Sequence, residues 1–212
     1  MARIAIIGAG GRIARLVTER LLADTDHELT LYLRDPDRLG RIDPDRATAV
    51  AGDVNDTATL AAAVKGADAV FSGVGGTDLD AQTDSLIEAM ARSGARRLVF
   101  ISMIGVHDEV PGEFGRWNAS MIGPYLAAAK PSAERIEASG LDYTILRPTW
   151  LSDEDEVDYE TLGRDEPVLG TEVSRTSVAD LAVRLLTDPA LMARQSIGVV
   201  KPGTEGDKPA WH

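Results

Sequence analysis

Residues 3–14 read RIAIIGAGGRIA and decide the fold of this chain. An apolar run of β-type residues leads straight into a glycine cluster, and a helical pattern follows. Gly8 allows the sharp turn between strand and helix, Gly11 lets a phosphate approach bare backbone, and Ala14 is small enough for the helix to press against the sheet. The start of that helix offers unpaired N–H groups and a positive dipole end. The stretch therefore predicts a phosphate-binding turn at the beginning of an α/β fold.

The spacing of the small residues separates two kinds of glycine turn. Counted as G-x-G-x-x-G from Gly8, the third glycine would fall on Ile13, and the pattern fails. Counted as G-x-x-G-x-x-G/A, Gly8, Gly11 and Ala14 all fit. The second spacing resembles the short-chain dehydrogenase/reductase superfamily more than the two-domain dehydrogenases. A purely structural turn is the alternative, and the strand before it and the helix after it count against that alternative.

Composition limits the classes of protein to be considered. The 212 residues include 44% hydrophobic residues but few aromatic ones, which is typical of a buried parallel sheet built from aliphatic side chains. A net charge of −12 disfavours binding to nucleic acid or to an anionic membrane, whereas a few local cations can still hold a small anionic cofactor. The chain has no cysteine, and its three histidines are far apart in sequence, so we predict no disulfide, thiol catalysis or metal site.

Strand-like and helix-like segments alternate along the whole chain. They predict a Rossmann-like, doubly wound parallel sheet in one domain over residues 1–212, in which 148–212 contribute substrate-side loops and the last helix and strand. Two long segments, 103–120 and 148–170, are predicted as loops at the carboxyl ends of strands, where ligands bind in such sheets. Strands are predicted at 3–7, 28–33, 47–51, 68–73, 97–101, 142–147 and 195–200, and helices at 11–23, 56–65, 80–93, 121–139 and 176–187.

The sequence also gives expectations about location and partners. No apolar run approaches the length of a membrane-spanning helix, and the first strand begins too early for a cleavable signal peptide. We therefore expect a cytoplasmic protein whose partner is a small-molecule substrate, with no nucleic-acid or membrane partner. Oligomerisation is neither indicated nor excluded.

Further motifs follow the glycine turn in a characteristic order. Together they resemble the atypical short-chain dehydrogenase/reductases, an NAD(P)H-binding group often called NmrA-like, and the resemblance covers nearly the whole chain. The glycine turn and the segment SGLDYTILRP (139–148) are its most specific parts. The other motifs are Arg34-Asp35 after the second strand, Gly52-Asp53-Val54 after the third, Ser72-Gly73-Val74-Gly75 after the fourth, and Ser102 after the fifth.

The resemblance implies a dinucleotide site along the carboxyl ends of the strands. At the end of the second strand an arginine pairs with a 2′-phosphate, whereas a carboxylate accepts from a ribose hydroxyl. Arg34 there, with Arg12 beside the turn, favours NADP, and Asp35 leaves NAD as the alternative. In the family Asp53 contacts the adenine amine. The implied cofactor-binding residues are Gly8, Gly10, Gly11, Arg12, Ile13, Arg34, Asp35, Asp53, Val54, Gly73, Val74, Gly75, Pro148, Thr149 and Trp150.

The resemblance implies a catalytic group less firmly. Short-chain reductases use a tyrosine, a lysine four residues later on the same helix face, and a serine that holds the carbonyl oxygen. The residues available are Ser102, Tyr125 and Lys130. Tyr125 and Lys130 are five residues apart, which places them about 140° apart around a helix. Pro131 would either start that helix or kink it. The alternative is that Tyr125 and Lys130 are ordinary helix residues near the cleft.

The function expected from the resemblance is an NADP(H)-dependent oxidoreductase acting on a small carbonyl, quinone or flavin-like acceptor held between the two long loops. One alternative is a non-catalytic NAD(P)-binding redox sensor, because the tyrosine and lysine spacing is irregular. Another is an NAD-dependent epimerase or dehydratase, which ranks lower because residues 148–212 leave little room for a sugar-nucleotide pocket.

Overall fold

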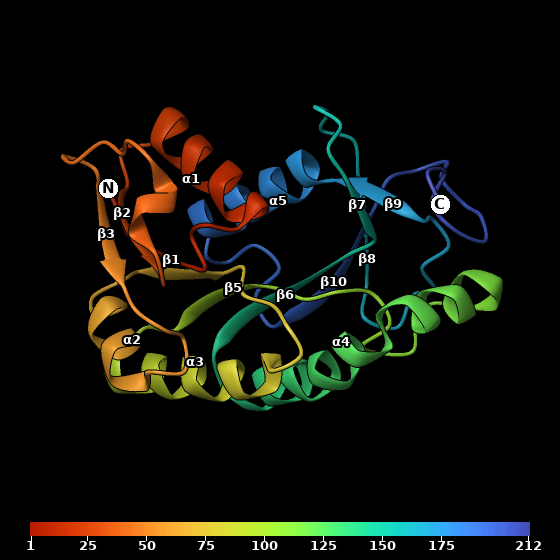
Figure 1. Cartoon of the computed structure of the whole chain (residues 1–212), viewed down its shortest axis with the longest axis horizontal. Coiled ribbons are helices and arrows are strands. Elements are labelled where there is room, and N and C mark those ends of the chain that lie inside the picture. The colour runs from red at the N-terminus through yellow and green to blue at the C-terminus, as the bar shows by residue number, and fades with distance from the viewer.

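An eight-stranded sheet forms the centre of the computed structural model, which describes residues 1–212 (Figure 1). Seven strands are parallel, and the edge strand β8 runs antiparallel to β10. The strand order is β3-β2-β1-β4-β5-β6-β10-β8, so the direction of winding reverses between β1 and β4. This confirms the predicted doubly wound, Rossmann-like sheet. The strands are β1 (Arg3–Ile7), β2 (Glu28–Leu33), β3 (Ala47–Ala51), β4 (Ala69–Ser72), β5 (Arg97–Ile101), β6 (Asp142–Pro148), β8 (Glu160–Leu162) and β10 (Gln195–Val200).

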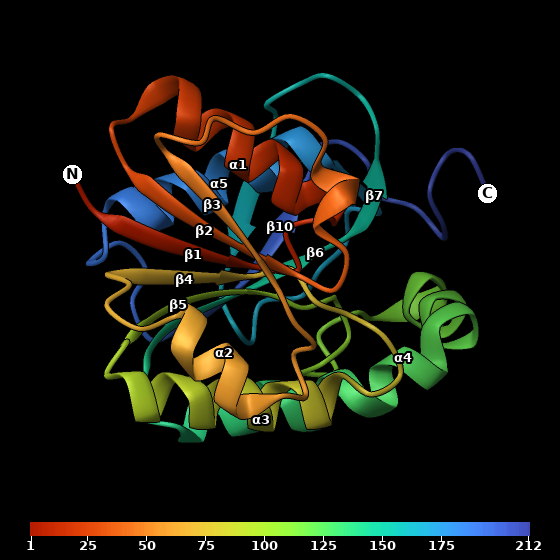
Figure 2. The ribbon, with the colours of Figure 1, turned by 60° about the vertical axis from the view of Figure 1, so that its left-hand side comes forward.

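Helices cover both faces of this sheet, as Figures 1 and 2 show. One layer contains α1 (Arg12–Asp24) and α5 (Arg175–Thr187), and the other contains α2 (Thr57–Ala63), α3 (Leu79–Ser93) and α4 (Gly112–Ala138). A short 3-10 helix, Pro36–Leu39, follows β2. A separate parallel pair, β7 (Trp150–Ser152) and β9 (Glu172–Ser174), lies beyond the carboxyl end of β6. No helix in the chain combines the length and the apolar character needed to cross a membrane.

The alternation of side chains along the strands builds two apolar layers. In β1, Ile4 and Ile6 belong to the core on the α1 and α5 side, whereas Ala5 and Ile7 belong to the core on the other side. All four are at most 1% exposed. The sequence of such a strand is a continuous apolar run because both of its faces are buried. The rigid sheet that results fixes the strand ends from which the site is built.

The prediction of one loop over 103–120 is wrong, because α4 begins at Gly112 and is 27 residues long. Glycines and prolines in this region favour a loop on propensity alone. In the structure, buried Phe114 packs against Ile104 and Val168, and this packing holds the first turns of the helix. Pro124 and Pro131 both lie inside α4.

The second predicted loop, 148–170, is also more ordered than expected. It contains β7 and β8, and the last residue of β6 is Pro148. These strands are only three residues long, so their hydrogen bonds depend on distant partners in β9 and β10. Such pairing cannot be recognised from three residues of local sequence.

Candidate functional site

Two cavities lie at the carboxyl ends of the parallel strands. The first has a volume of about 590 Å³ and spans the ends of β1 to β4, where the strand order reverses. Open α/β sheets bind ligands at this reversal point. It is lined by Gly8, Gly10, Gly11, Tyr32, Leu33, Arg34, Asp35, Arg38, Gly52, Asp53, Val54, Asn55, Gly73, Val74, Gly75, Asp78 and Gln82.

The glycine turn presents open backbone to this cavity. Gly8 has φ +75°, and Gly11 donates to its carbonyl oxygen at 2.9 Å. Gly11 is the N-cap of α1 and supplies no side-chain cap, so no protein group accepts from the N–H groups of Arg12 and Ile13. The side chains of these two residues point elsewhere, since Arg12 pairs with Asp153 and Ile13 packs in the core. Only the backbone N–H groups of Arg12 and Ile13, and not their side chains, are therefore placed to contact an anion in the turn.

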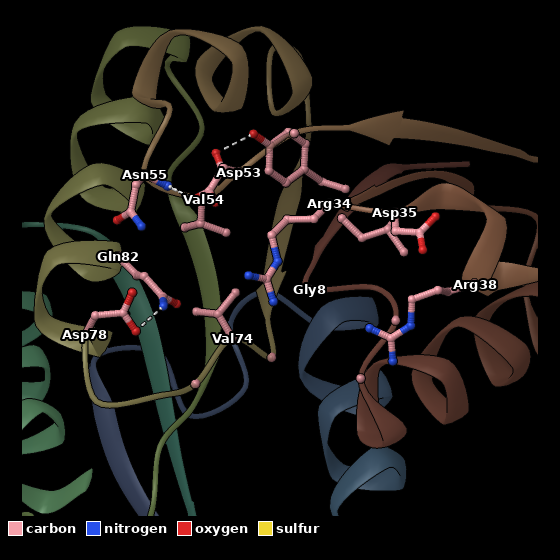
Figure 3. A pocket seen from close by; sticks show the side chains of 17 residues that line it. Gly8, Arg34, Asp35, Arg38, Asp53, Val54, Asn55, Val74, Asp78 and Gln82 are labelled. Carbon is pink, nitrogen blue, oxygen red and sulfur yellow. Dashed lines mark hydrogen bonds between the residues drawn. The ribbon is translucent and has the colours of Figure 1, made fainter. Parts of the chain in front are cut away.

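Two guanidinium groups reach into the first cavity. Figure 3 shows Arg34 extending from the end of β2 and Arg38 projecting from the 3-10 helix toward the glycine turn. Neither guanidinium has an acidic partner or a protein hydrogen-bond acceptor. Asp35 is the N-cap of the 3-10 helix, and its carboxylate accepts from the N–H of Asp37 at 3.2 Å. The arrangement leaves two free cations at the end of β2, beside the Asp35 carboxylate, of which one oxygen has no protein partner.

Tyr32 and the turn after β3 form the opposite wall of the first cavity. The Tyr32 hydroxyl donates to the carbonyl oxygen of Asp53 at 2.7 Å, and burial, followed by Asp56 and Asp53, raises the pKa of Tyr32 to about 12. The Asp53 carboxylate accepts from the N–H of Asn55 at 2.8 Å. A Cβ at Gly52 would lie 2.2 Å from the Tyr32 oxygen, so this position requires glycine. The turn therefore has a fixed shape, and one carboxylate oxygen of Asp53 has no protein partner.

Several residues that line the first cavity were not predicted from the sequence, because they belong to none of its motifs. One signal for Arg38 was present, since a capping Asp35 followed by proline predicts a helical turn that brings Arg38 back toward the glycine cluster. Asp78 and Gln82 pair with each other at 2.8 Å on the far side of the cavity (Figure 3). The residues missed are Tyr32, Leu33, Arg38, Asn55, Asp78 and Gln82.

The second cavity, of about 470 Å³, lies at the ends of β5 and β6 and has a mostly apolar wall. Because β4 and β5 are paired, it is next to the first cavity along the same edge of the sheet. It contains Pro148, Thr149 and Trp150, which are absent from the wall of the first cavity. The lining residues are Ser102, Met103, Ile104, Asn118, Ile122, Tyr125, Pro148, Thr149, Trp150, Leu151, Arg175, Trp211 and His212.

Of the three predicted catalytic residues, the second cavity contains two. The Ser102 hydroxyl is buried without a hydrogen-bond partner, and Tyr125 is 45% exposed. Lys130 is not in the cavity wall, and its ammonium group pairs with Asp108 at 2.5 Å. The five-residue separation turns Lys130 away from the face of α4 that carries Tyr125. The structure therefore brings a serine and a tyrosine together and leaves the lysine outside.

A cluster of aromatic rings lies at the second cavity, in which Trp150 and His212 line the wall and Trp117 packs against them. The ring centroids of Trp117 and Trp150 are 4.6 Å apart, and His212 lies 5.2 Å and 5.0 Å from them, respectively. The Trp150 indole donates to the Asn118 side chain at 3.0 Å. The cluster thus joins α4 and β7 to a segment near residue 212, a contact that no local sequence pattern predicts.

A buried polar cluster supports the segment between β5 and α4. Arg147, which belongs to the SGLDYTILRP motif, is fully buried and pairs with Glu109. His107 lies beside them, with its side chain 4% exposed and its ring nitrogen 2.9 Å from the Ser196 hydroxyl. Burial, and then the positive charges of Arg147 and Arg164, lower the pKa of His107. We infer that His107 is neutral in the folded protein at neutral pH.

This lowered pKa predicts a loss of stability in mild acid. Below the ordinary histidine pKa of 6.5, the unfolded chain takes up a proton at His107 that the folded chain does not. The free energy of unfolding is therefore expected to fall as pH decreases below 6.5, by at most about 1.4 kcal/mol per pH unit, and to level off below the folded pKa. Urea unfolding at several pH values, comparing wild type with His107→Gln, measures this. Equal pH slopes would contradict it, since His27 is present in both proteins.

Known proteins share both the sequence and the fold of this chain. Residues 8–189 match the family described as NAD(P)H-binding. A Bacillus subtilis protein named as an uncharacterised sugar epimerase is 30% identical over 164 residues, covering 72% of this chain and 73% of that protein. A Veillonella parvula short-chain dehydrogenase/reductase, solved in complex with NADP, is 32% identical with a TM-score of 0.90, covering 99% of both chains. A Rossmann-fold NAD(P)-binding protein from Shigella flexneri is 40% identical with a TM-score of 0.84, covering 99% of this chain and 98% of the other.

Proposed function

The chain belongs to the NAD(P)H-binding family, and on that premise we propose that it is an NADP(H)-dependent oxidoreductase acting on a small carbonyl, quinone or flavin-like acceptor. The observation that carries the proposal is the juxtaposition of the two cavities. The first offers open amides and free guanidinium groups, and the second, beside it, offers the hydroxyl groups of Ser102, Tyr125 and Thr149 in a mostly apolar wall. A dinucleotide lying along the strand ends would bring its reactive ring next to an acceptor in the second cavity.

The lining of the first cavity suits each part of NADP(H). The diphosphate would lie against the amides of the glycine turn, the 2′-phosphate between Arg34 and Arg38, and the adenine amine at the free oxygen of Asp53. Gly73, Val74 and Gly75 would line the path toward the second cavity, where Pro148, Thr149 and Trp150 would meet the carboxamide. The Veillonella relative, which was solved with NADP, supports this choice of cofactor.

Arg34→Ala is expected to raise the Kd for NADPH about ten- to a hundredfold and to change the Kd for NADH little. The reason is that a charge-assisted pair with the 2′-phosphate contributes roughly 1.5–3 kcal/mol. Calorimetric titration with both cofactors measures the difference. Arg92→Ala, which removes an exposed arginine paired with Glu88 on α3, is the matched control. Equal losses for the two cofactors would show that Arg34 does not read the 2′-phosphate.

The second cavity contains two groups that a carbonyl reduction would use, the Ser102 and Tyr125 hydroxyls. When bound, the cofactor supplies the hydride to the acceptor carbon. The Ser102 hydroxyl, which has no protein partner, would donate a hydrogen bond to the acceptor oxygen. The Tyr125 hydroxyl would deliver the proton to the same oxygen as the hydride arrives, and its own proton would be replaced from solvent. Lys130, held by Asp108, has no role in this scheme.

A direct test is to mix the protein with NADPH and a panel of quinones, flavins, aldehydes and ketones and to follow the loss of NADPH absorbance. We expect oxidation above background with at least one acceptor class. Tight NADPH binding by calorimetry without oxidation of any panel member would count strongly against an oxidoreductase.

That negative outcome would favour the second candidate, a redox sensor that binds the dinucleotide without turnover. The observation favouring it is the Lys130–Asp108 pair, which leaves Tyr125 without the lysine that short-chain reductases use. An epimerase or dehydratase, although suggested by the name of the Bacillus relative, ranks lower. The second cavity is largely apolar and offers few groups to bind the hydroxyls of a sugar.

A further inference from the structure

Arg175, at the start of α5, holds its side chain in the wall of the second cavity. Its Nη1 atom donates to the carbonyl oxygens of Leu151 and Ser152, both at 3.1 Å, and to the Asp153 carboxylate at 2.7 Å. The side chain is 19% exposed. These three contacts of one nitrogen restrain the position of the guanidinium before any ligand arrives.

The other edge of this guanidinium is free. No protein group accepts a hydrogen bond from its Nε or Nη2. Neither of these two atoms is buried. These two atoms point the same way and form a fork whose spacing matches the two oxygens of a carboxylate. The fork is therefore free to bind an anion, on a residue that lines the second cavity.

The apolar surroundings of Arg175 strengthen the attraction between its charge and an anion. Arg175 is the one lining residue of the second cavity that is an arginine, lysine, aspartate or glutamate. Its neighbours in the wall include Ile104, Trp150 and Leu151. An ion pair formed among apolar side chains is screened less than one on the surface. Although the chain has a net charge of −12 and Arg175 is paired with Asp153, the only such charge in the lining of this cavity is positive.

We propose that Arg175 recognises a carboxylate on the acceptor, so that the substrates of this protein are carbonyl or quinone compounds with an apolar ring body and one carboxylate group. This inference rests on the proposed function in taking the second cavity as the place of the acceptor. The apolar wall would hold the ring, and the fork of Arg175 would fix which end of the molecule faces Ser102 and Tyr125.

Asp153 offers a second, independent way to test the positive charge of Arg175. Its carboxylate lies between two guanidinium groups, those of Arg175 and Arg12, and therefore competes with a bound anion for Arg175. Asp153→Asn keeps an oxygen for the hydrogen bond from Nη1 but removes the negative charge. The proposal therefore expects Asp153→Asn to strengthen anion binding and Arg175→Gln to weaken it.

The experiment uses two ring compounds of matched shape, 2-naphthoate and its neutral counterpart 2-naphthamide. Both are titrated into the full chain with saturating NADP⁺, and binding is followed by tryptophan fluorescence, because Trp150 and Trp211 line the cavity. Wild type is expected to bind the carboxylate more tightly than the amide. Arg175→Gln is expected to weaken the carboxylate about tenfold or more and Asp153→Asn to tighten it, with the amide unchanged in both variants.

A wild-type protein that does not prefer the carboxylate would overturn the proposal, and so would a loss of both probes in Arg175→Gln together with no gain of carboxylate affinity in Asp153→Asn. That second pattern would mean that Arg175 only holds residues 151–153 in place. The assay needs no turnover. It therefore separates failure of this inference from failure of the oxidoreductase proposal, which the NADPH oxidation panel decides.

Discussion

Tyr125→Phe is expected to lower kcat for NADPH oxidation by about a hundredfold or more, with the Kd for NADPH unchanged. The variant keeps the ring in the wall of the second cavity and removes the hydroxyl that would protonate the acceptor oxygen. The measurement is steady-state turnover with the best acceptor of the panel, together with calorimetric titration of NADPH.

Tyr159→Phe is the matched control for Tyr125→Phe, because the Tyr159 hydroxyl bonds to Asp180 and lines neither cavity. It is expected to turn over like wild type. If Tyr125→Phe kept the wild-type kcat, this tyrosine would not be the proton donor, and the acceptor oxygen would have to take its proton from water or another group. A parallel variant, Ser102→Ala, tests the serine hydroxyl of the cavity in the same assay.

Arg147→Met is expected to reduce the free energy of unfolding by about 3–5 kcal/mol. Arg147 and Glu109 are both buried, so removing the arginine leaves the glutamate charge without compensation. The guanidinium also donates to the carbonyl oxygens of Gly163 and Ser196, and these two acceptors would lose a partner. Urea unfolding at neutral pH measures the change.

The control for Arg147→Met is the double variant Glu109→Leu/Arg147→Met. A buried ion pair replaced as a whole by apolar residues often costs little, so the double variant is expected to be more stable than Arg147→Met alone. A double variant as unstable as the single one would indicate that the hydrogen bonds to Gly163 and Ser196, and not the unpaired charge, account for the loss.

Local sequence was sufficient to predict most of the sheet and the edge at which the two cavities lie. The apolar run Ile4 to Ile7 is buried on both faces, and the glycine turn after it presents open amides at the reversal of strand order. Arg34 directly follows β2 and Asp53 lies two residues after β3, and both line the first cavity. These features were predictable because the strands are long enough to show their pattern, and the position of a residue after a strand fixes the edge at which it lies.

Contacts between distant segments were not predictable in this way. The first turns of α4 have a loop-like composition, and their helical form depends on packing of Phe114 against Ile104 and Val168. The pairing of Lys130 with Asp108 likewise depends on where the segment after β5 returns to α4. A local pattern records neither contact, since each is made by residues that approach one another only after the sheet has formed.

The sequence by itself determined the alternating architecture, the glycine turn with its open amides, and the edge of the sheet at which that turn lies. The tertiary structure alone decided which side chains share a cavity. It placed Ser102 and Tyr125 together without Lys130, added Arg38 to the first cavity, and set Arg175 in the wall of the second. The physical reason is that backbone periodicity and turn chemistry act over a few residues, whereas a cavity is bounded by side chains that long-range packing brings into contact.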